Sequence, residues 1–338
     1  MRSSSHAPAT PAHWTTRGPL ACALRPLAAL YGAAAAFDAW RYRQGWRHRA
    51  RLPVPVIVVG NVVAGGAGKT PTTLALVRHL QQRGWTPGIV SRGYGRRGDA
   101  VRGVSPGDAA EAVGDEPLLL ARQLPGVPVF VGRRRADAGL ALLRAHPQVD
   151  LIVCDDGLQH HALARDVEIC VFDERGLGNG WLIPAGPLRE PWPRRGASAD
   201  KLLVLHTGRE VAPALSGTGW HAARRLASHA HDAQGQHWPL AQLAARPLLA
   251  VAGIARPQAF FDMLAQAGVR PQRSQGFPDH YAFQPGDFDL ADGATVLCTE
   301  KDAVKIWPFM PDALAVGLTL DVPAAFWATL DRRLQAFR

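Results

Sequence analysis

Cysteine, methionine and tyrosine are scarce in this sequence of 338 residues, which contains 4, 3 and 4 of them. The four cysteines, Cys22, Cys154, Cys170 and Cys298, are scattered and form no Cys-x-x-Cys pair. This scatter argues against a disulfide-built scaffold and gives no zinc pattern. Cys154 and Cys170 fall inside apolar runs typical of strands, so we expect buried thiols in a reducing compartment.

A long hydrophobic run is also absent. The apolar stretch that begins at residue 20 is interrupted by Arg25 and Asp38, which leaves it too short to span a bilayer comfortably. No clear signal-peptide layout is present. Residues 1–19 are rich in Ser, Ala, Pro and Thr without periodicity, and we expect them to be disordered.

The stretch from residue 20 to 51 instead predicts an amphipathic helix with a basic tail. Apolar residues recur at steps of three and four, which places them on one helical face: Leu20, Leu24, Leu27, Tyr31, Ala34 and Phe37. Five arginines follow: Arg41, Arg43, Arg47, Arg49 and Arg51. This arrangement suits an anionic membrane surface. The alternative is a helix packed on its own domain, followed by a solvated basic tail.

The formal net charge of +10 indicates an anionic partner, which the charge alone does not identify. Nucleic acid, a phospholipid surface and a phosphorylated substrate all fit. The folded part contains no aromatic RNA-binding motif, zinc pattern or basic recognition helix. We therefore expect no nucleic-acid partner.

Residues 53–76 read PVPVIVVGNVVAGGAGKTPTTLAL and predict a phosphate-binding loop. Residues 54–59 have the length and β-branching of a buried strand, and a helix is expected from residue 70. Backbone N–H groups at the helix start can bind phosphate, Lys69 can reach the outer phosphates, and Thr70 can hold Mg²⁺. The first glycine of G-x-x-x-x-G-K-S/T is replaced by Val63. A plain strand-to-helix turn is the alternative, but it does not account for Lys69 followed by Thr70.

The sequence beyond this loop alternates between strand and helix patterns. Strands are expected at 87–90, 127–131, 149–154, 166–173 and 201–206, with helices at 116–124 and 133–145. A second unit has strand patterns at 247–252 and 294–299 and helix patterns at 257–267 and 323–337. We predict an α/β fold: a P-loop NTPase-like parallel sheet flanked by helices, with a smaller C-terminal α/β domain and an N-terminal amphipathic helix.

The expected division is a disordered N-terminus (1–19), a membrane-associating helix (20–51), a P-loop core domain (52–208), a linking region (209–246) and a smaller C-terminal domain (247–338). Ligands of such sheets bind at the carboxyl ends of the strands. Asp155 and Asp156 end one strand and resemble a Walker B element that holds Mg²⁺, directly or through water. The pattern does not say which of them touches the metal, and a turn with helix-capping duty is the alternative.

Six motifs in register between residues 59 and 305 resemble one family, the tetraacyldisaccharide 4′-kinases of lipid A biosynthesis. They are VGNxxxGGxGKTP, SRGYGR, GDEP, DDGxQH, IPxGPLRE and TEKDAVK. The resemblance implies a membrane-associated P-loop kinase on the cytoplasmic face of the bacterial inner membrane, peripheral or monotopic. It also implies transfer of the ATP γ-phosphate to the 4′-hydroxyl of a tetraacyldisaccharide 1-phosphate, forming lipid IVA. We predict no obligate protein partner.

The same resemblance implies roles for individual residues. ATP would be bound by Val63, Ala64, Gly65, Gly66, Ala67, Gly68, Lys69 and Thr70. Mg²⁺ would be held by Thr70, Asp155 and Asp156. Asp115 of GDEP matches a general base and His280 of FPDHY its partner, with Lys69 as the catalytic cation. Tyr281 stands where the family often has a second histidine. Substrate contacts are expected from Tyr94, Arg133, Gln159, His160, Asn179, Arg189 and Glu190.

A second hypothesis retains the phosphate loop but changes the class. Nucleotide-switching ATPases that partition cargo or carry metal clusters have a related loop, K-G-G-x-G-K-T. Their signature lysine corresponds to Ala64 in this sequence. The missing lysine favours the kinase.

Overall fold

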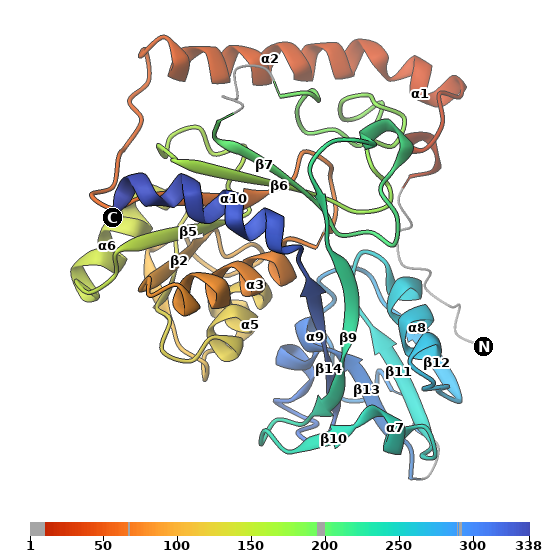
Figure 1. Cartoon of the computed structure of the whole chain (residues 1–338). Helices are drawn as coiled ribbons and strands as arrows, with labels where there is room; N and C mark the ends of the chain where they lie inside the picture. Colours follow the sequence, from red (N-terminus) through yellow and green to blue (C-terminus); the bar gives the residue numbers. More distant parts are fainter. Residues whose placement is uncertain (1–10, 67, 195–199, 289, 291–292) are drawn as a thin grey trace.

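Two mixed, mostly parallel β-sheets form the framework of the protein, as seen in a computed structural model that describes residues 11–66, 68–194, 200–288, 290 and 293–338 (Figure 1). The first sheet has the order β3-β4-β2-β5-β1-β6-β7-β8. Its strands are β1 (Val56–Gly60), β2 (Pro87–Ser91), β3 (Arg102–Val104), β4 (Val129–Val131), β5 (Leu151–Asp155), β6 (Val167–Phe172), β7 (Leu202–His206) and β8 (Trp220–His221). Only β3 runs antiparallel to its neighbour. The predicted α/β class is confirmed.

Helices cover both faces of the first sheet. Successive side chains of a strand point to opposite faces, so Ile57 and Val59 pack beneath α3 (Lys69–Gln82), α5 (Asp115–Gln123) and α10 (Ala324–Leu334). Val56 and Val58 pack on the other face, under α6 (Arg135–Ala145) and the loops that follow β5 and β6. Burial on both faces explains why these strands read as unbroken apolar runs.

The second sheet has the order β10-β9-β14-β13-β11-β12. Its strands are β9 (Ala223–His231), β10 (His237–Pro239), β11 (Leu248–Ala252), β12 (Arg273–Gly276), β13 (Thr295–Thr299) and β14 (Leu314–Asp321). Helices α7 (Leu240–Leu243) and α8 (Pro257–Gln266) pack on one face. The other face is covered by α9 (Glu300–Ile306) and by Phe277, Phe283 and Phe288. A small apolar cluster that includes Leu118, Leu119 and Val304 joins α4 (Ala110–Val113) and α5 to α9.

The N-terminal helices α1 (Pro19–Ala23) and α2 (Arg25–Arg43) lie along one side of the first sheet, above the loops that follow β5 and β6 (Figure 1). Small residues make the inward contact: Ala28 is buried, and a side chain at Gly32 would meet Leu182 at 2.6 Å. Larger apolar residues face outward, with Leu30 68% and Phe37 52% exposed. Within the described ranges, no helix is both long enough and apolar enough to traverse a bilayer.

Three observations differ from the expected division of the chain. Residues 11–18 are ordered: Trp14 donates to the Pro184 carbonyl at 3.1 Å, and a short 3₁₀ helix covers Ala12–Trp14. Residues 1–10 lie outside the described part of the chain. The expected linking region supplies β8 to the first sheet and β9 and β10 to the second. Finally, α10 returns to the first sheet, because its apolar residues Phe326 and Leu330 find their burial there.

Candidate active site

The phosphate loop connects β1 to α3, as the sequence predicts. Gly65 and Gly68 adopt positive φ angles of 94° and 82°, which glycine tolerates without steric cost. The Asn61 amide donates to the Val63 carbonyl at 2.5 Å and to the Gly65 carbonyl at 3.2 Å, holding the loop from inside. Ala67 lies outside the described residues. Helix α3 begins at Lys69, and because the first N–H groups of a helix have no intrahelical partner, its start offers backbone donors and the positive end of a helix dipole.

Lys69 is the first residue of α3 and is only 8% exposed. Its Nζ lies 3.8 Å from Oδ1 of Asp156, and the Arg189 guanidinium lies 3.4 Å from the same oxygen. Asp156 has a positive φ of 49°, which directs the chain sharply away from the end of β5. The predicted residues Lys69, Asp156 and Arg189 therefore form one charged group beside the loop.

Asp155 is fully buried at the end of β5, which pairs with β1. Its Oδ1 accepts a hydrogen bond from Thr73 at 2.8 Å, and its Oδ2 has no hydrogen-bond partner in the described part of the chain. Burial raises the pKa of Asp155, and the nearby charges of Glu116 and Asp156 raise it further. A buried carboxylate oxygen with no partner fits a divalent cation, which would restore the ionised state.

No cluster of three or more His, Cys, Asp or Glu side chains in the described ranges is arranged to hold a metal. Magnesium in nucleotide sites needs no such cluster, because one or two carboxylates act together with phosphate oxygens and water. Thr70 follows Lys69 in α3 and is partly exposed, so its hydroxyl is available near the loop. The residues present therefore fit magnesium brought in with a nucleotide.

Asp115 and His280 meet although they are 165 positions apart in the chain. Asp115 begins α5, directly after Gly114 with a φ of 94°. His280 Nδ1 lies 2.9 Å from Oδ2 and 3.2 Å from Oδ1 of Asp115. The exposed Tyr94 ring lies 5.2 Å from the His280 ring, between centroids. Asp115 belongs to the first unit and His280 to the second, so this contact spans both.

Two lysines that sequence reasoning did not assign complete this group. Lys301 Nζ lies 3.9 Å and Lys305 Nζ 3.8 Å from Asp115 Oδ2. Both extend from α9, where a spacing of four residues places them on one helical face. Lys301 also lies 3.4 Å from Glu116 and 3.1 Å from Asp279. The spacing of Lys301 and Lys305 within TEKDAVK indicates that both lie on one face of a helix. The local sequence does not indicate which residues that face contacts.

The cluster changes the ionisation of both predicted catalytic groups. Burial acts to raise the pKa of Asp115, but the His280 hydrogen bond and the charges of Lys301 and Lys305 outweigh it and lower that pKa to about 2. The hydrogen bond to Asp115 raises the pKa of His280, against burial and the charge of Lys301. Asp115 is therefore held as a carboxylate, and its hydrogen bond shifts the pKa of His280 upward.

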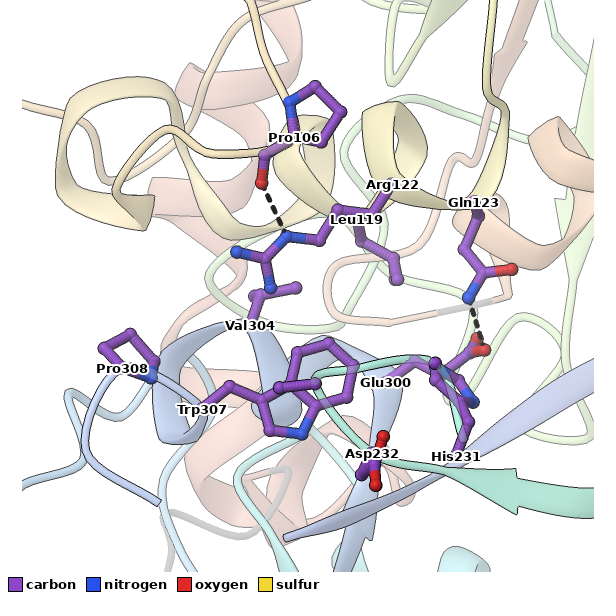
Figure 2. Close-up of a pocket in the computed structure, with 12 residues that line it drawn as sticks. Pro106, Leu119, Arg122, Gln123, His231, Asp232, Glu300, Val304, Trp307 and Pro308 are labelled. Atoms are coloured by element: carbon purple, nitrogen blue, oxygen red, sulfur yellow. Dashed lines mark hydrogen bonds between the residues drawn. The ribbon is translucent and has the colours of Figure 1, made fainter. Parts of the chain in front are cut away.

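Helices α5 and α9 are joined a second time at the far end of α5 (Figure 2). Gln123 donates to Glu300 at 2.6 Å, and the Arg122 guanidinium stacks over Trp307 with 5.5 Å to the ring centroid. These residues line a cavity of about 470 Å³ between the two units. Burial raises the pKa of Glu300 to about 7. The contacts of Gln123 with Glu300 and of Arg122 with Trp307 thus hold α5, and with it Asp115, against the lysines of α9.

Three of the remaining predicted substrate residues make hydrogen bonds that hold the loops around the site. Gln159 donates to the Asn61 carbonyl at 2.9 Å and to Glu190 at 2.8 Å, which ties both side chains to the phosphate loop. Asn179 is buried and donates to the carbonyls of His13, Thr16 and Ala185. Its side chain therefore organises the loop under α1, and we expect its effect on substrate to be indirect.

Arg133 and His160 differ in exposure: Arg133 is exposed and His160 is half-buried. Arg133 is 71% exposed and lies 3.5 Å from Asp99. Burial and the charges of Arg135 and Arg165 lower the pKa of His160 to about 4.

Tyr281, at the position where the family often has a second histidine, packs in the aromatic cluster of Phe277, Phe283 and Phe288, with 4.8 Å between its ring centroid and that of Phe277. The contact between His280 and Asp115 is formed with Tyr281 turned away into that cluster.

A phosphate loop between a buried strand and a helix, with a lysine and an acidic strand end beside it, defines a P-loop nucleotide-binding protein. The carboxylate of Asp115, at the start of α5, is suited to accept the proton of a hydroxyl group that receives a phosphoryl group. The chain belongs to the tetraacyldisaccharide-1-P 4′-kinase family, whose sequence profile matches residues 20–335.

Close relatives support this membership. A tetraacyldisaccharide 4′-kinase of Acidovorax sp. (strain JS42) is 57% identical over 321 residues, covering 95% of this chain and 93% of the relative. The enzyme of Stenotrophomonas maltophilia (strain R551-3) is 48% identical over 97% of both chains. A crystal structure of LpxK from Aquifex aeolicus in complex with ATP superposes with a TM-score of 0.80 at 29% identity, covering 94% of this chain and all of that one.

Proposed function

We propose that this protein is a tetraacyldisaccharide 4′-kinase, which transfers the γ-phosphate of ATP to the 4′-hydroxyl of a tetraacyldisaccharide 1-phosphate. The observation that carries the proposal is the Asp115–His280 pair, at 2.9 Å, built onto a P-loop fold. Glu116, adjacent to Asp115, is close enough to Asp155 to raise its pKa, which links this pair to the nucleotide side of the site. The curated relatives carry the same activity in their names.

ATP binds, in this proposal, along the loop from Val63 to Thr70, with its phosphates at the start of α3. Lys69 neutralises charge on the outer phosphates, and Asp156 holds the ammonium group near the loop. Thr70, Asp155 and Asp156 would hold Mg²⁺, which when bound neutralises phosphate charge.

Asp115 accepts the proton of the attacking sugar hydroxyl. The His280 hydrogen bond and the charges of the neighbouring lysines lower its pKa to about 2, which keeps it ionised at any physiological pH. His280 orients the carboxylate through two contacts and stabilises its charge. Such a weak base suits phosphoryl transfer, in which positioning and charge neutralisation supply most of the catalysis.

Helices α1 and α2 provide the membrane-binding surface in this proposal. Leu20, Leu27, Leu30 and Phe37 are more than half exposed, and arginines follow them. This surface suits the cytoplasmic face of the inner membrane, where an acylated lipid substrate would be embedded. The Tyr31 hydroxyl of α2 donates to the Arg189 carbonyl at 2.8 Å, so the helix is joined directly to the charged group beside the loop. Tyr94, Arg133, Arg189, Gln159, His160 and Glu190 remain our candidates for substrate contact.

The test is direct transfer. Purified full-length protein is incubated with γ-labelled ATP, Mg²⁺ and tetraacyldisaccharide 1-phosphate in mixed micelles, and the lipid is extracted. Label should appear in the lipid with wild-type protein and fall to background with Asp115→Asn. ATP hydrolysis that proceeds without lipid labelling would support the nucleotide-switch hypothesis instead.

A further inference from the structure

One arginine of the second sheet reaches the phosphate loop of the first unit. Arg224 lies on β9, opposite Leu320 of β14. Its Nη2 donates to the Thr207 hydroxyl at 2.7 Å. A Cβ atom placed on Gly68 would lie 2.8 Å from the same nitrogen, so the guanidinium lies against the residue that precedes Lys69.

Two other guanidiniums near the loop have carboxylate partners. Arg175 pairs with Asp173 at 2.8 Å and donates to the Gly66 carbonyl at 2.8 Å. Arg256, which precedes α8, pairs with Glu174. These two arginines are therefore neutralised locally.

Arg224 has no such partner. No carboxylate lies within 4 Å of it among the residues that the structure describes, and its buried Nε makes no hydrogen bond to them. Burial lowers the pKa of its guanidinium, although Glu174 and Asp173 oppose that effect from a distance. A largely buried cation without a close counterion is costly, and an anion bound beside it would offset that cost.

The geometry indicates where such an anion would lie. Gly68 is the N-cap of α3, and the first N–H groups of a helix bind phosphate because they have no intrahelical partner. Gly68 has a φ of 82° and no side chain, so nothing of its own separates the loop from Arg224. An anion bound at this helix start would therefore lie close to both the N–H groups and the guanidinium.

We propose that Arg224 binds the polyphosphate of the nucleotide, as the contribution of the second unit to the nucleotide site. The inference deepens the proposed function, since it rests on ATP being the ligand of the loop. Planar guanidinium groups suit phosphate oxygens because they donate two parallel hydrogen bonds. Because β9 belongs to the second sheet, nucleotide binding also draws on the placement of that unit, which carries His280 as well.

The chain offers a matched control for this proposal. Arg225 is the next residue of the same strand, is 71% exposed and lies 3.9 Å from Asp321 at the surface. Full-length wild type, Arg224→Ala, Arg224→Lys and Arg225→Ala are compared by calorimetry with ATP, inorganic tripolyphosphate and adenosine. Circular dichroism and thermal unfolding without ligand establish that each variant is folded.

Arg224→Ala should weaken the binding of both ATP and tripolyphosphate by about 10- to 100-fold, the usual effect of losing a charge-assisted hydrogen bond. Adenosine binding should be unchanged, and Arg225→Ala should match wild type within about twofold. Arg224→Lys keeps the charge but loses the paired donors, so its affinity for ATP and tripolyphosphate should lie between those of wild type and Arg224→Ala. If Arg224→Ala does not fold, Arg224→Lys decides the matter by the same comparison.

The inference is overturned if the folded Arg224 variant binds tripolyphosphate as well as Arg225→Ala does. It is also overturned if adenosine loses as much affinity as ATP, because Arg224 would then support only the shape of the site. None of these measurements requires lipid. Failure of wild-type protein to phosphorylate the lipid would refute the proposed function, while a selective loss of polyphosphate binding would still uphold the role of Arg224.

Discussion

Removing Asp115 and His280, singly and together, should show that they act as one catalytic unit. We choose Asp115→Asn, which keeps the shape of the carboxyl group, and His280→Asn, because asparagine tolerates the positive φ of 62° at that position. Each variant should lower kcat strongly and leave the KM for ATP nearly unchanged. The double variant should be scarcely slower than the poorer single variant, since coupled residues are not additive.

The structure indicates how large the loss of kcat in each variant should be. Asp115 is 7% exposed, and its pKa falls from 3.8 to about 2, which at about 1.4 kcal/mol per unit is roughly 2 kcal/mol in favour of the carboxylate. The His280 hydrogen bond is the largest effect that lowers the pKa of Asp115. Loss of His280 should therefore lower kcat by about 10- to 100-fold, the usual effect of losing a hydrogen bond to a charged group. Loss of the base itself should cost about 10²- to 10⁴-fold.

The same pKa makes a prediction about stability that is independent of catalysis. Because the folded pKa of Asp115 is depressed, its contribution is fully present above the unfolded value near 3.8 and is lost as the pH falls towards 2. Asp115→Asn should therefore be less stable than wild type at pH 7, and the difference should shrink between pH 4 and pH 2. Urea unfolding followed by circular dichroism measures it.

Rates come from single-turnover transfer of labelled phosphate to lipid, with ATP affinity measured separately. The reasoning is refuted if the losses of the two single variants multiply in the double variant. His280 would then act on its own, in substrate binding or in the placement of the loop. A stability difference that does not change with pH would likewise show that Asp115 is not held as a carboxylate by this cluster.

Three further predictions concern other parts of the molecule. Lys69→Ala should abolish transfer and keep the circular dichroism spectrum of wild type, and normal turnover would remove Lys69 from the mechanism. Leu30→Ser with Phe37→Ser should shift the protein from anionic vesicles to the supernatant in sedimentation, whereas Leu140→Ser, at an exposed position of α6, should not. Burial raises the pKa of Glu300 to about 7, so the wild type should lose stability as the pH rises from 4.5 to 7. Glu300→Gln should lack that loss, gaining about 2 kcal/mol on wild type between pH 5 and pH 8 in urea unfolding. Parallel stability curves would contradict the assignment.

Local chemistry made much of this protein predictable from its sequence. The strand before the phosphate loop is evident because burial on both faces requires an unbroken apolar run. The loop is evident because Gly65 and Gly68 supply backbone freedom and Lys69 supplies charge at fixed spacing. Each of these signals lies within about 20 consecutive residues, so no knowledge of distant partners was required.

Only the tertiary structure shows which distant groups meet. The sequence contains Lys301 and Lys305 one helical turn apart, but their position beside Asp115 depends on α5 packing against α9. Arg224 lies in a stretch that we expected to be a linking region, because β9 lacks a regular apolar pattern and most of its residues are only partly buried. Its pairing with β14 places it in a sheet and brings its guanidinium to Gly68. The last helix returns to the first sheet for the same kind of reason: Phe326 and Leu330 are apolar in any context, but the surface that buries them is formed by strands and helices far away in the chain.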